Sequence, residues 1–393
     1  MASSRAHADP RSEYASRLAT RRAVADRYVR VDRALSAVRI ALAVAFFVLW
    51  WLTLGPRGIT PRWLLLPAAL FVAVAVAHEW VARRRRTADR AVAFYERGLA
   101  RLEERWAGAG DGGSRYLDET HPYAADLDLF GRASLFERLC TARTRGGQDA
   151  LARWLCAPAS REEALARQSA VAELAPRLDL REELALAGED VQSGTDPEAL
   201  VRWCTAPPVA FPRHARAITA AFAALNVLAA AAWALGAGGH ALVLALALSG
   251  AWAGRLSANV QRTIGSGDRP GRDLMLLALV LSRLEREPFE APLLAALRRR
   301  LDTEGLPPSR QLRRLARLHD LLESRRNQLF VPIALPLLWT TQIALAIEAW
   351  RRRVGPAVVH WLSAVSEIEA LSSLAGYAYE RPEDPFPEIV EDG

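Results

Sequence analysis

Two apolar runs near the N-terminus restrict the fold of this chain more than any other feature. The first covers Ile40–Leu54, and the second covers Trp63–Val81, where the only polar residues are His78 and Glu79 near its end. With its flanks, each run approaches the length that a helix needs to cross about 30 Å of hydrocarbon. The GPRGITPR sequence between the runs breaks the helix. Residues 38–82 are therefore predicted to form a transmembrane hairpin, with a buried pair of soluble helices as the alternative.

Aromatic and basic residues mark the ends of this hairpin. Four tryptophans lie where amphipathic rings favour the headgroup region: Trp50, Trp51, Trp63 and Trp80. Arginines are dense before the hairpin and in the run Arg83–Arg86 directly after it, whereas the turn holds only Arg57 and Arg62. Because positive charge accumulates on the cytoplasmic side, both ends of the hairpin are predicted to be cytoplasmic. A nucleic-acid contact is the alternative interpretation of Arg83–Arg86.

A second pair of apolar runs lies in the middle of the chain. Ala217–Leu235 and Ala241–Ala253 flank the turn GAGGH, and arginines precede and follow them. We therefore predict a second hairpin, over residues 206–262, with the same orientation. A third apolar segment, 329–350, is interrupted by two prolines and several polar residues, which favours a buried soluble helix. The sequence leaves open whether this third segment enters the membrane.

The polar segment between the hairpins has the pattern of short capped helices. Ser134 and Ser160 each precede a glutamate by three residues, which is the capping-box pattern. The sequence TRGGQ is predicted to end the first of these helices, with Gly146 and Gly147 at positive backbone angles. On a later helix four residues are predicted to share one stripe: Leu165, Gln168, Val171 and Leu174. No strand-like alternation occurs, so the fold class is predicted to be all-α.

Composition supplies no catalytic or metal-binding candidate. The chain holds three cysteines, at spacings that fit neither a disulfide framework nor a thiolate metal site, and its seven histidines are scattered. The net charge is +7, and since there is no lysine every basic side chain is an arginine. Such a charge is compatible with anionic lipid or nucleic acid. The row Arg298, Arg299 and Arg300 closes a predicted helix, where cations suit the helix dipole, and contact with phosphate is its alternative role.

The order of several motifs resembles the helical core of the MutS family of DNA mismatch-recognition ATPases. These motifs are the turn Thr141–Gly147, the helix ARWL at 152–155 and RQSAVAEL at 167–174, with SEIEALSSLAGYAYE at 366–380 similar to the end of that core. The likeness is closest to the sub-branch in which the core is joined to membrane-spanning helices, and it covers roughly residues 125–205 and 265–390. It marks these structural core positions: Leu135, Thr144, Gly147, Trp154, Leu155, Pro158, Glu369 and Leu371.

The resemblance implies a role in ATP-dependent sensing of DNA mismatches or damage, with double-stranded DNA and either a homodimer or a separate ATPase as partners. Members of the family are DNA-dependent ATPases whose phosphate loop ends in a lysine, which this chain cannot supply. ATP and Mg²⁺ are therefore expected only if an ATPase domain follows Gly393. The alternative function is a non-catalytic membrane scaffold or protein-interaction module built on a degenerate MutS core.

The sequence thus predicts an all-α, multi-helical MutS-like core with two transmembrane hairpins in the cytoplasmic (inner) membrane, with the core and both termini cytoplasmic. Its divisions are a basic N-terminal segment (1–37), the first hairpin (38–82), a linker (83–125), the first part of the core (126–205), the second hairpin (206–262), the second part of the core (263–380) and an acidic, Pro-rich tail (381–393).

Overall fold

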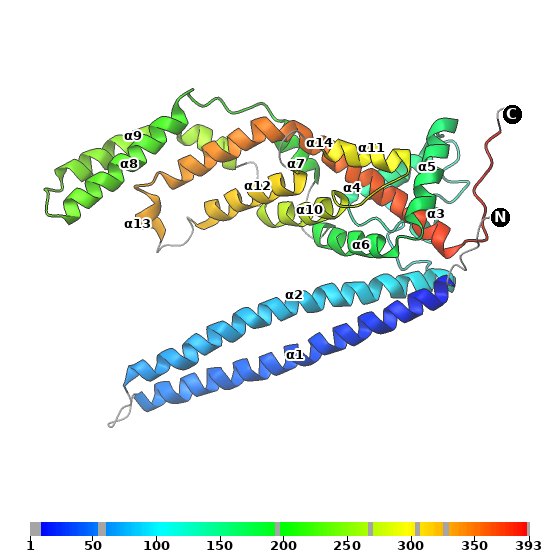
Figure 1. Cartoon of the computed structure of the whole chain (residues 1–393), viewed down its shortest axis with the longest axis horizontal. Helices are drawn as coiled ribbons and strands as arrows, with labels where there is room; N and C mark the ends of the chain where they lie inside the picture. The colour runs from blue at the N-terminus through cyan, green and yellow to red at the C-terminus, as the bar shows by residue number, and fades with distance from the viewer. Residues whose placement is uncertain are drawn as a thin grey trace. The chain divides into compact units, whose positions relative to one another are not determined.

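The described part of the chain consists of helices and loops. The computed structural model describes residues 9–53, 60–192, 197–265, 270–302, 307–324 and 330–390, and contains no β-strand within them (Figure 1). The all-α prediction is confirmed for these residues, while most of the predicted helix-breaking turn before Pro61 lies outside them. The contacts divide the chain into two compact units. The first comprises Met1–Ser114, Phe130–Arg138 and Tyr379–Asp384, and the second comprises Arg115–Leu129, Leu139–Ala378 and Pro385–Gly393.

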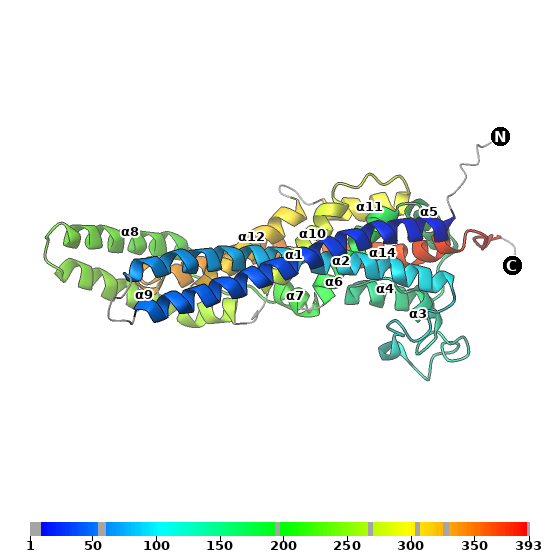
Figure 2. The same ribbon diagram turned by 90° about the horizontal axis from the view of Figure 1, so that it is seen from below.

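The first unit is built on two long antiparallel helices. These are α1 (Pro10–Thr53) and α2 (Leu65–Leu102), which lie side by side in both views (Figures 1 and 2), with the 3₁₀ helix η1 (Pro61–Leu64) leading into α2. A further 3₁₀ turn, η2 (Ser114–Tyr116), and the short helix α3 (Leu135–Leu139) follow in the chain. Residues 83–102, predicted to be part of a linker, instead continue α2. Their small and aromatic side chains explain this, since Ala88, Ala91 and Phe94 are buried.

Within the first unit, polar contacts from α1 and α2 bind the side chain of Glu380, beside the buried rings of Tyr14 and Tyr95. Arg101 donates to both carboxylate oxygens of Glu380, at 2.6 and 2.8 Å, and the Tyr14 hydroxyl donates to the same carboxylate at 3.1 Å. The Tyr14 ring also packs edge-on against Tyr95, with ring centroids 5.9 Å apart. Nearby, Ser134 accepts from the Glu137 backbone N–H at 3.2 Å, so the capping interaction predicted there is present.

The longest helix of the second unit is α14 (Trp339–Glu380), which contributes to its main apolar core and whose last residues belong to the first unit. The others are α4 (Arg145–Cys156), α5 (Arg161–Leu174), α6 (Leu178–Gln192), α7 (Pro197–Thr205), α8 (Ala215–Ala234), α9 (His240–Ile264), α10 (Pro270–Leu284), α11 (Pro292–Leu301), α12 (Pro308–Glu323) and α13 (Val331–Ala334). Apolar residues of α14, including Ile347, Val358 and Trp361, are buried in its core. Each fully buried side chain of this size contributes about 1.5–3 kcal/mol to folding.

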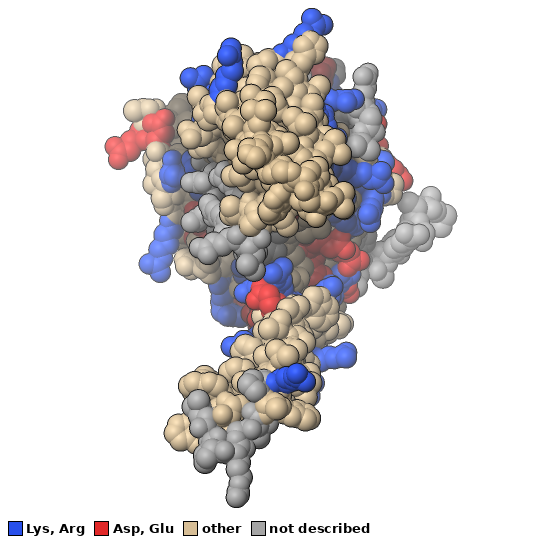
Figure 3. Space-filling view, turned by 90° about the vertical axis from the view of Figure 1, so that its left-hand side faces the viewer, with Lys and Arg blue, Asp and Glu red and all other residues tan. Residues whose placement is uncertain are grey.

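Four of the described helices are long and apolar enough to cross a membrane: α1, α2, α8 and α9. Large apolar side chains on their predicted spans are exposed, among them Trp51, Val76, Leu228 and Val243. Over the α8–α9 hairpin the surface facing the viewer is uncharged, while arginines lie toward its edges (Figure 3). These features support membrane association of both hairpins, because a water-exposed apolar surface of this extent is unfavourable.

Two predicted features differ in the structure. Segment 329–350, expected to be one buried helix, contains the single-turn helix α13, an irregular stretch and then the start of α14. Its prolines explain the interruption, because proline cannot continue the backbone hydrogen-bond pattern inside a helix. Leu165, predicted to lie in one stripe with Val171 and Leu174, is 43% exposed, whereas the other two are buried.

Candidate functional site: the junction of α4 and α14

Two residues on which the family resemblance rests meet at one buried contact in the second unit. The Thr144 hydroxyl donates to Oε2 of Glu369, although 225 residues separate them along the chain. The backbone N–H groups of Arg143 and Thr144 also donate to Oε1 of Glu369, each at 3.4 Å. Glu369 lies on α14 and Thr144 directly precedes α4, so this carboxylate joins the two parts of the core that flank the α8–α9 hairpin.

Thr144 also begins α4. It is extended, with φ −86° and ψ 148°, and its hydroxyl oxygen accepts from the Gly147 backbone N–H at 3.1 Å. A threonine at this position satisfies one of the helix's free N–H groups, which is worth about 1 kcal/mol. The hydroxyl therefore acts in both directions, as acceptor within α4 and as donor to α14.

The glycine pair after Thr144 permits this close approach. Gly146 and Gly147 lie in the first turn of α4, and neither has a positive φ, so the prediction that they end the preceding helix was wrong. A Cβ atom on Gly147 would lie 2.5 Å from Oε2 and 2.8 Å from Cβ of Glu369, and one on Gly146 would lie 2.3 Å from Oγ of Ser366. The glycines are required by helix contact rather than by turn geometry. The sequence signal for this role was their position two and three residues after a capping threonine.

Further contacts extend this junction. The Thr141 backbone N–H donates to Oγ of Ser373 at 3.1 Å, one turn beyond Glu369 along α14. Glu369 is only 5% exposed. Burial raises the pKa of its carboxyl group above the usual value, and the hydrogen bonds from Thr144 and Arg143 oppose this rise. The carboxylate accepts hydrogen bonds from uncharged donors, so the contact depends on the protonation state of Glu369 and on the close approach of α4 to α14.

The remaining predicted core residues lie outside this contact. Trp154 of α4 stacks under the Arg167 guanidinium, 4.1 Å from the ring centroid, and Leu371 is fully buried. Leu155 is partly buried, whereas Leu135 and Pro158 are exposed. The arginine row ends α11, where Arg298 and Arg299 are exposed and Arg300 donates to Glu367 at 3.0 Å. The row remains at a helix end, as predicted, and is not part of the junction.

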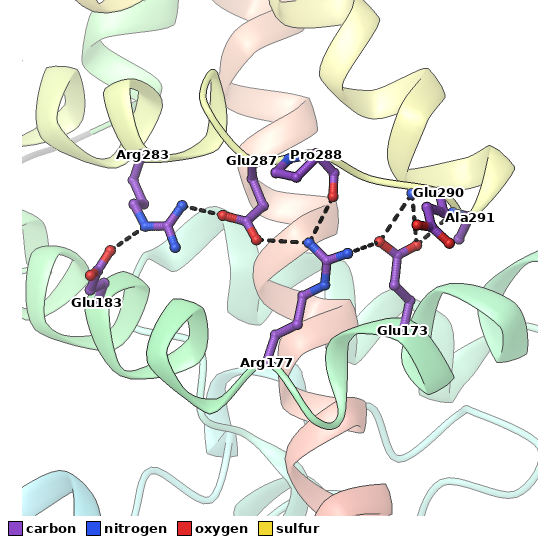
Figure 4. A network of polar contacts seen from close by, with 8 residues as sticks. All are labelled: Glu173, Arg177, Glu183, Arg283, Glu287, Pro288, Glu290 and Ala291. Carbon is purple, nitrogen blue, oxygen red and sulfur yellow. Dashed lines mark hydrogen bonds and ion pairs between the residues drawn. The ribbon is translucent and has the colours of Figure 1, made fainter. Parts of the chain in front are cut away.

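A second set of contacts joins the two parts of the core and was not predicted from the sequence (Figure 4). Arg177, in the loop between α5 and α6, donates to Glu173 at 2.6 Å, to Glu287 at 2.7 Å and to the Pro288 carbonyl at 2.8 Å. Glu287 also pairs with Arg283, which in turn pairs with Glu183. Glu173 completes the network by accepting from the backbone N–H groups of Glu290 and Ala291. The pairs that join the two parts of the core lie 100 or more residues apart in the chain, so no local sequence pattern identifies them.

A cavity of about 470 Å³ adjoins the junction. Its lining is mainly apolar, from Leu200 and Val201 of α7, Leu277 of α10 and Leu362 of α14, and Thr144 is among its polar lining residues. Among the described residues, no group of three or more His, Cys, Asp and Glu side chains is placed to hold a metal ion. The chain has no lysine, the residue with which a P-loop binds the phosphates of ATP.

None of the family models, curated proteins or solved structures with which the chain was compared matches it.

Proposed function

We propose that this chain is a membrane-anchored, MutS-like helical core that serves an ATP-dependent DNA mismatch- or damage-sensing system, without performing the ATPase reaction through its own residues. The observation that carries the proposal is the Thr144–Glu369 contact. Both residues were marked by their resemblance to the MutS core, from opposite sides of the second hairpin. Their meeting in one buried contact supports a common core fold interrupted by that hairpin.

In this proposal α14 is the connecting element between the membrane and the core. Near its start, the Asn226 side chain of α8 donates to the Pro336 carbonyl at 2.8 Å. Further along the same helix, Glu369 holds the start of α4. A helix transmits displacement along its axis when packed side chains hold it, so α14 gives a route between the hairpin and the α4 junction. The ATPase, whether part of a longer chain or a separate partner, would act on this core, and a homodimer is the expected assembly.

Orientation is part of the proposal. The excess of arginine next to both hairpins favours a multi-pass protein of the cytoplasmic membrane, with the core and both termini in the cytoplasm. That side also holds the DNA and ATP that such a system would use. The exposed Arg298 and Arg299 of α11 are the proposed phosphate contacts.

Duplex binding tests this function. The chain would be placed in nanodiscs of zwitterionic phosphatidylcholine, and the anisotropy of a labelled duplex with or without one mismatch would be followed at two salt concentrations. If two phosphates are contacted, the Kd should rise about tenfold between about 50 and 200 mM salt. Replacing Arg298 and Arg299 by Gln should reduce this salt dependence. Empty nanodiscs provide the control for binding to lipid.

Negligible binding at low salt would refute the DNA-sensing function. The alternative, a membrane scaffold that holds a protein partner, would then take its place. Crosslinking in native membranes distinguishes the two, because a scaffold should retain its protein partner after nuclease treatment.

A further inference from the structure

An unusual polar contact joins the middle of α8 to the segment before α14. Asn226 is fully buried, and its side-chain amide donates to Oγ of Ser249 on α9 at 3.0 Å and to the Pro336 carbonyl at 2.8 Å. Asn226 lies 11 residues after the first residue of α8 and 8 residues before the last. At a rise of 1.5 Å per residue, these separations are about 16 and 12 Å. Pro336 is therefore level with the middle of a predicted membrane span.

The start of α14 then returns to the level at which α8 begins. Ala344 and Leu345 of α14 share one apolar cluster with Ala215, the first residue of α8, and with Leu256 of α9. Between Pro336 and Ala344 the chain thus passes from the middle of α8 to its first residue. If α8 spans a bilayer, this stretch lies within the half of the bilayer nearer the core.

The side chains of the preceding turn suit lipid rather than water. Val331, Ile333 and Leu335 are 46%, 53% and 65% exposed, and residues 330–339 contain no charged side chain. In water such a cluster would be unfavourable, whereas acyl chains cover it without cost. Helix α8 likewise has exposed apolar side chains, such as Leu228, which is 68% exposed.

Several polar groups of the irregular backbone in this stretch form hydrogen bonds inside the protein. Leu338, at φ 49°, donates its N–H to the Leu335 carbonyl at 3.1 Å, and the Gln342 side chain donates to the Leu337 carbonyl at 2.8 Å. Pro336 has no N–H to satisfy, and its carbonyl accepts from Asn226. Non-helical backbone at membrane depth is tolerated where it is buried in protein or lines a water-filled cavity. The buried Leu338 and the bond from Asn226 to the Pro336 carbonyl meet this condition on the side facing α8 and α9.

We propose that residues Val331–Thr341 form a re-entrant membrane segment, which enters the bilayer beside α8 and α9, turns at Pro336 and leaves as α14. Its partner is the acyl-chain region of the bilayer. This departs from the sequence-based expectation of a buried soluble helix for 329–350, and it rests on the proposed membrane insertion of α8 and α9. A membrane-embedded start of α14 would join the long helix of the core directly to lipid.

Spin-label depth measurements on the whole chain in phosphatidylcholine vesicles test the proposal. After removal of the native cysteines, single cysteines would replace Ile333 or Leu335, with Leu228 as the control within α8 and the exposed Leu165 of α5 as the control in water. Labels at 333 and 335 should collide mainly with oxygen, as at 228, and the label at 165 mainly with a water-soluble nickel complex. The lipid-facing and aqueous controls are thus both leucines with exposed side chains.

The possible results separate the two proposals. If the labels at 333 and 335 favour nickel while that at 228 favours oxygen, the re-entrant segment is refuted and the hairpin remains. If the label at 228 also favours nickel, insertion of the hairpin fails as well. The variant Asn226→Leu should raise the nickel accessibility of the label at 335 at least about twofold, and an unchanged value would refute the role of Asn226. Asn259→Leu, which removes a bond from α9 to the Ala210 carbonyl, is the matched control and should leave that label unchanged.

Discussion

Replacing Gly147 by alanine tests the close approach of α4 and α14. The new methyl group would lie 2.5 Å from Oε2 and 2.8 Å from Cβ of Glu369, and 3.1 Å from Cβ of Ala142. The carboxylate can shift but a Cβ atom moves only with its helix, so overpacking should cost about 1–3 kcal/mol. Alanine regains up to about 1 kcal/mol of helix propensity. We expect a net loss of about 1–2 kcal/mol, or a Tm lower by about 2–8 °C for a unit of this size.

The assay is thermal unfolding in detergent micelles, followed by tryptophan fluorescence. Gly254→Ala is the matched control, because Gly254 also lies within a helix but a Cβ atom there would meet nothing within 4 Å. This variant should unfold at the same temperature as the unaltered protein or at a higher one. An unchanged or raised Tm for Gly147→Ala would show that α4 and α14 do not approach as described.

Three further results are expected. The raised pKa of Glu369 makes the folded state bind more protons than the unfolded state above about pH 4.5, so the free energy of unfolding should fall as pH rises through the folded pKa. Glu369→Gln should flatten this slope in unfolding curves measured at several pH values. An unchanged slope would contradict the raised pKa of Glu369. Burial raises the pKa of the Cys204 thiol to about 12, so maleimide at pH 8 should modify Cys204 only after the protein is denatured. Peptide mass spectrometry would detect the modification. Rapid labelling of the native protein would show that the Cys204 thiol is accessible. Glu287→Gln should lower the free energy of unfolding by about 1–3 kcal/mol, because Arg177 and Arg283 lose a shared carboxylate. The control Glu162→Gln, at an exposed position, should change it by less than about 0.5 kcal/mol. Equal effects of the two variants would argue against the network.

Local features of the fold could be predicted from the sequence, whereas long-range ones could not. Ser134 and Ser160 cap helices as expected, because a capping box depends on residues three positions apart. The glycine pair at 146 and 147 was misinterpreted because the residues that it approaches, Ser366 and Glu369, lie more than 200 residues away and no local pattern identifies them. From the sequence, Pro336 could be predicted only to interrupt the apolar segment 329–350, and not to form a backbone turn. Its hydrogen bond to Asn226 depends on tertiary packing.

Thr144 and Glu369 show how far the family resemblance could define the candidate site. The resemblance marked both residues as core positions, but their mutual hydrogen bond follows from the path of α14 in three dimensions. The network around Arg177 was missed entirely, because arginines and glutamates are common on helix surfaces and sequence alone does not pair them. Buried contacts between residues far apart in the chain are therefore the features of this core that sequence patterns could not predict.

The proposed topology places a membrane hairpin within a helical core on the cytoplasmic side. Its most direct test is the sidedness of single cysteines in right-side-out membrane vesicles. In a cysteine-free background, Gly239→Cys would place a thiol at the turn before α9, and Leu165→Cys would place one on the core. An impermeant maleimide should label position 239 in intact vesicles and position 165 only after the vesicles are opened. If both positions are labelled in sealed vesicles, or both are protected until the vesicles are opened, the turn of the hairpin and the core lie on the same side of the membrane. Either result would contradict the proposed topology.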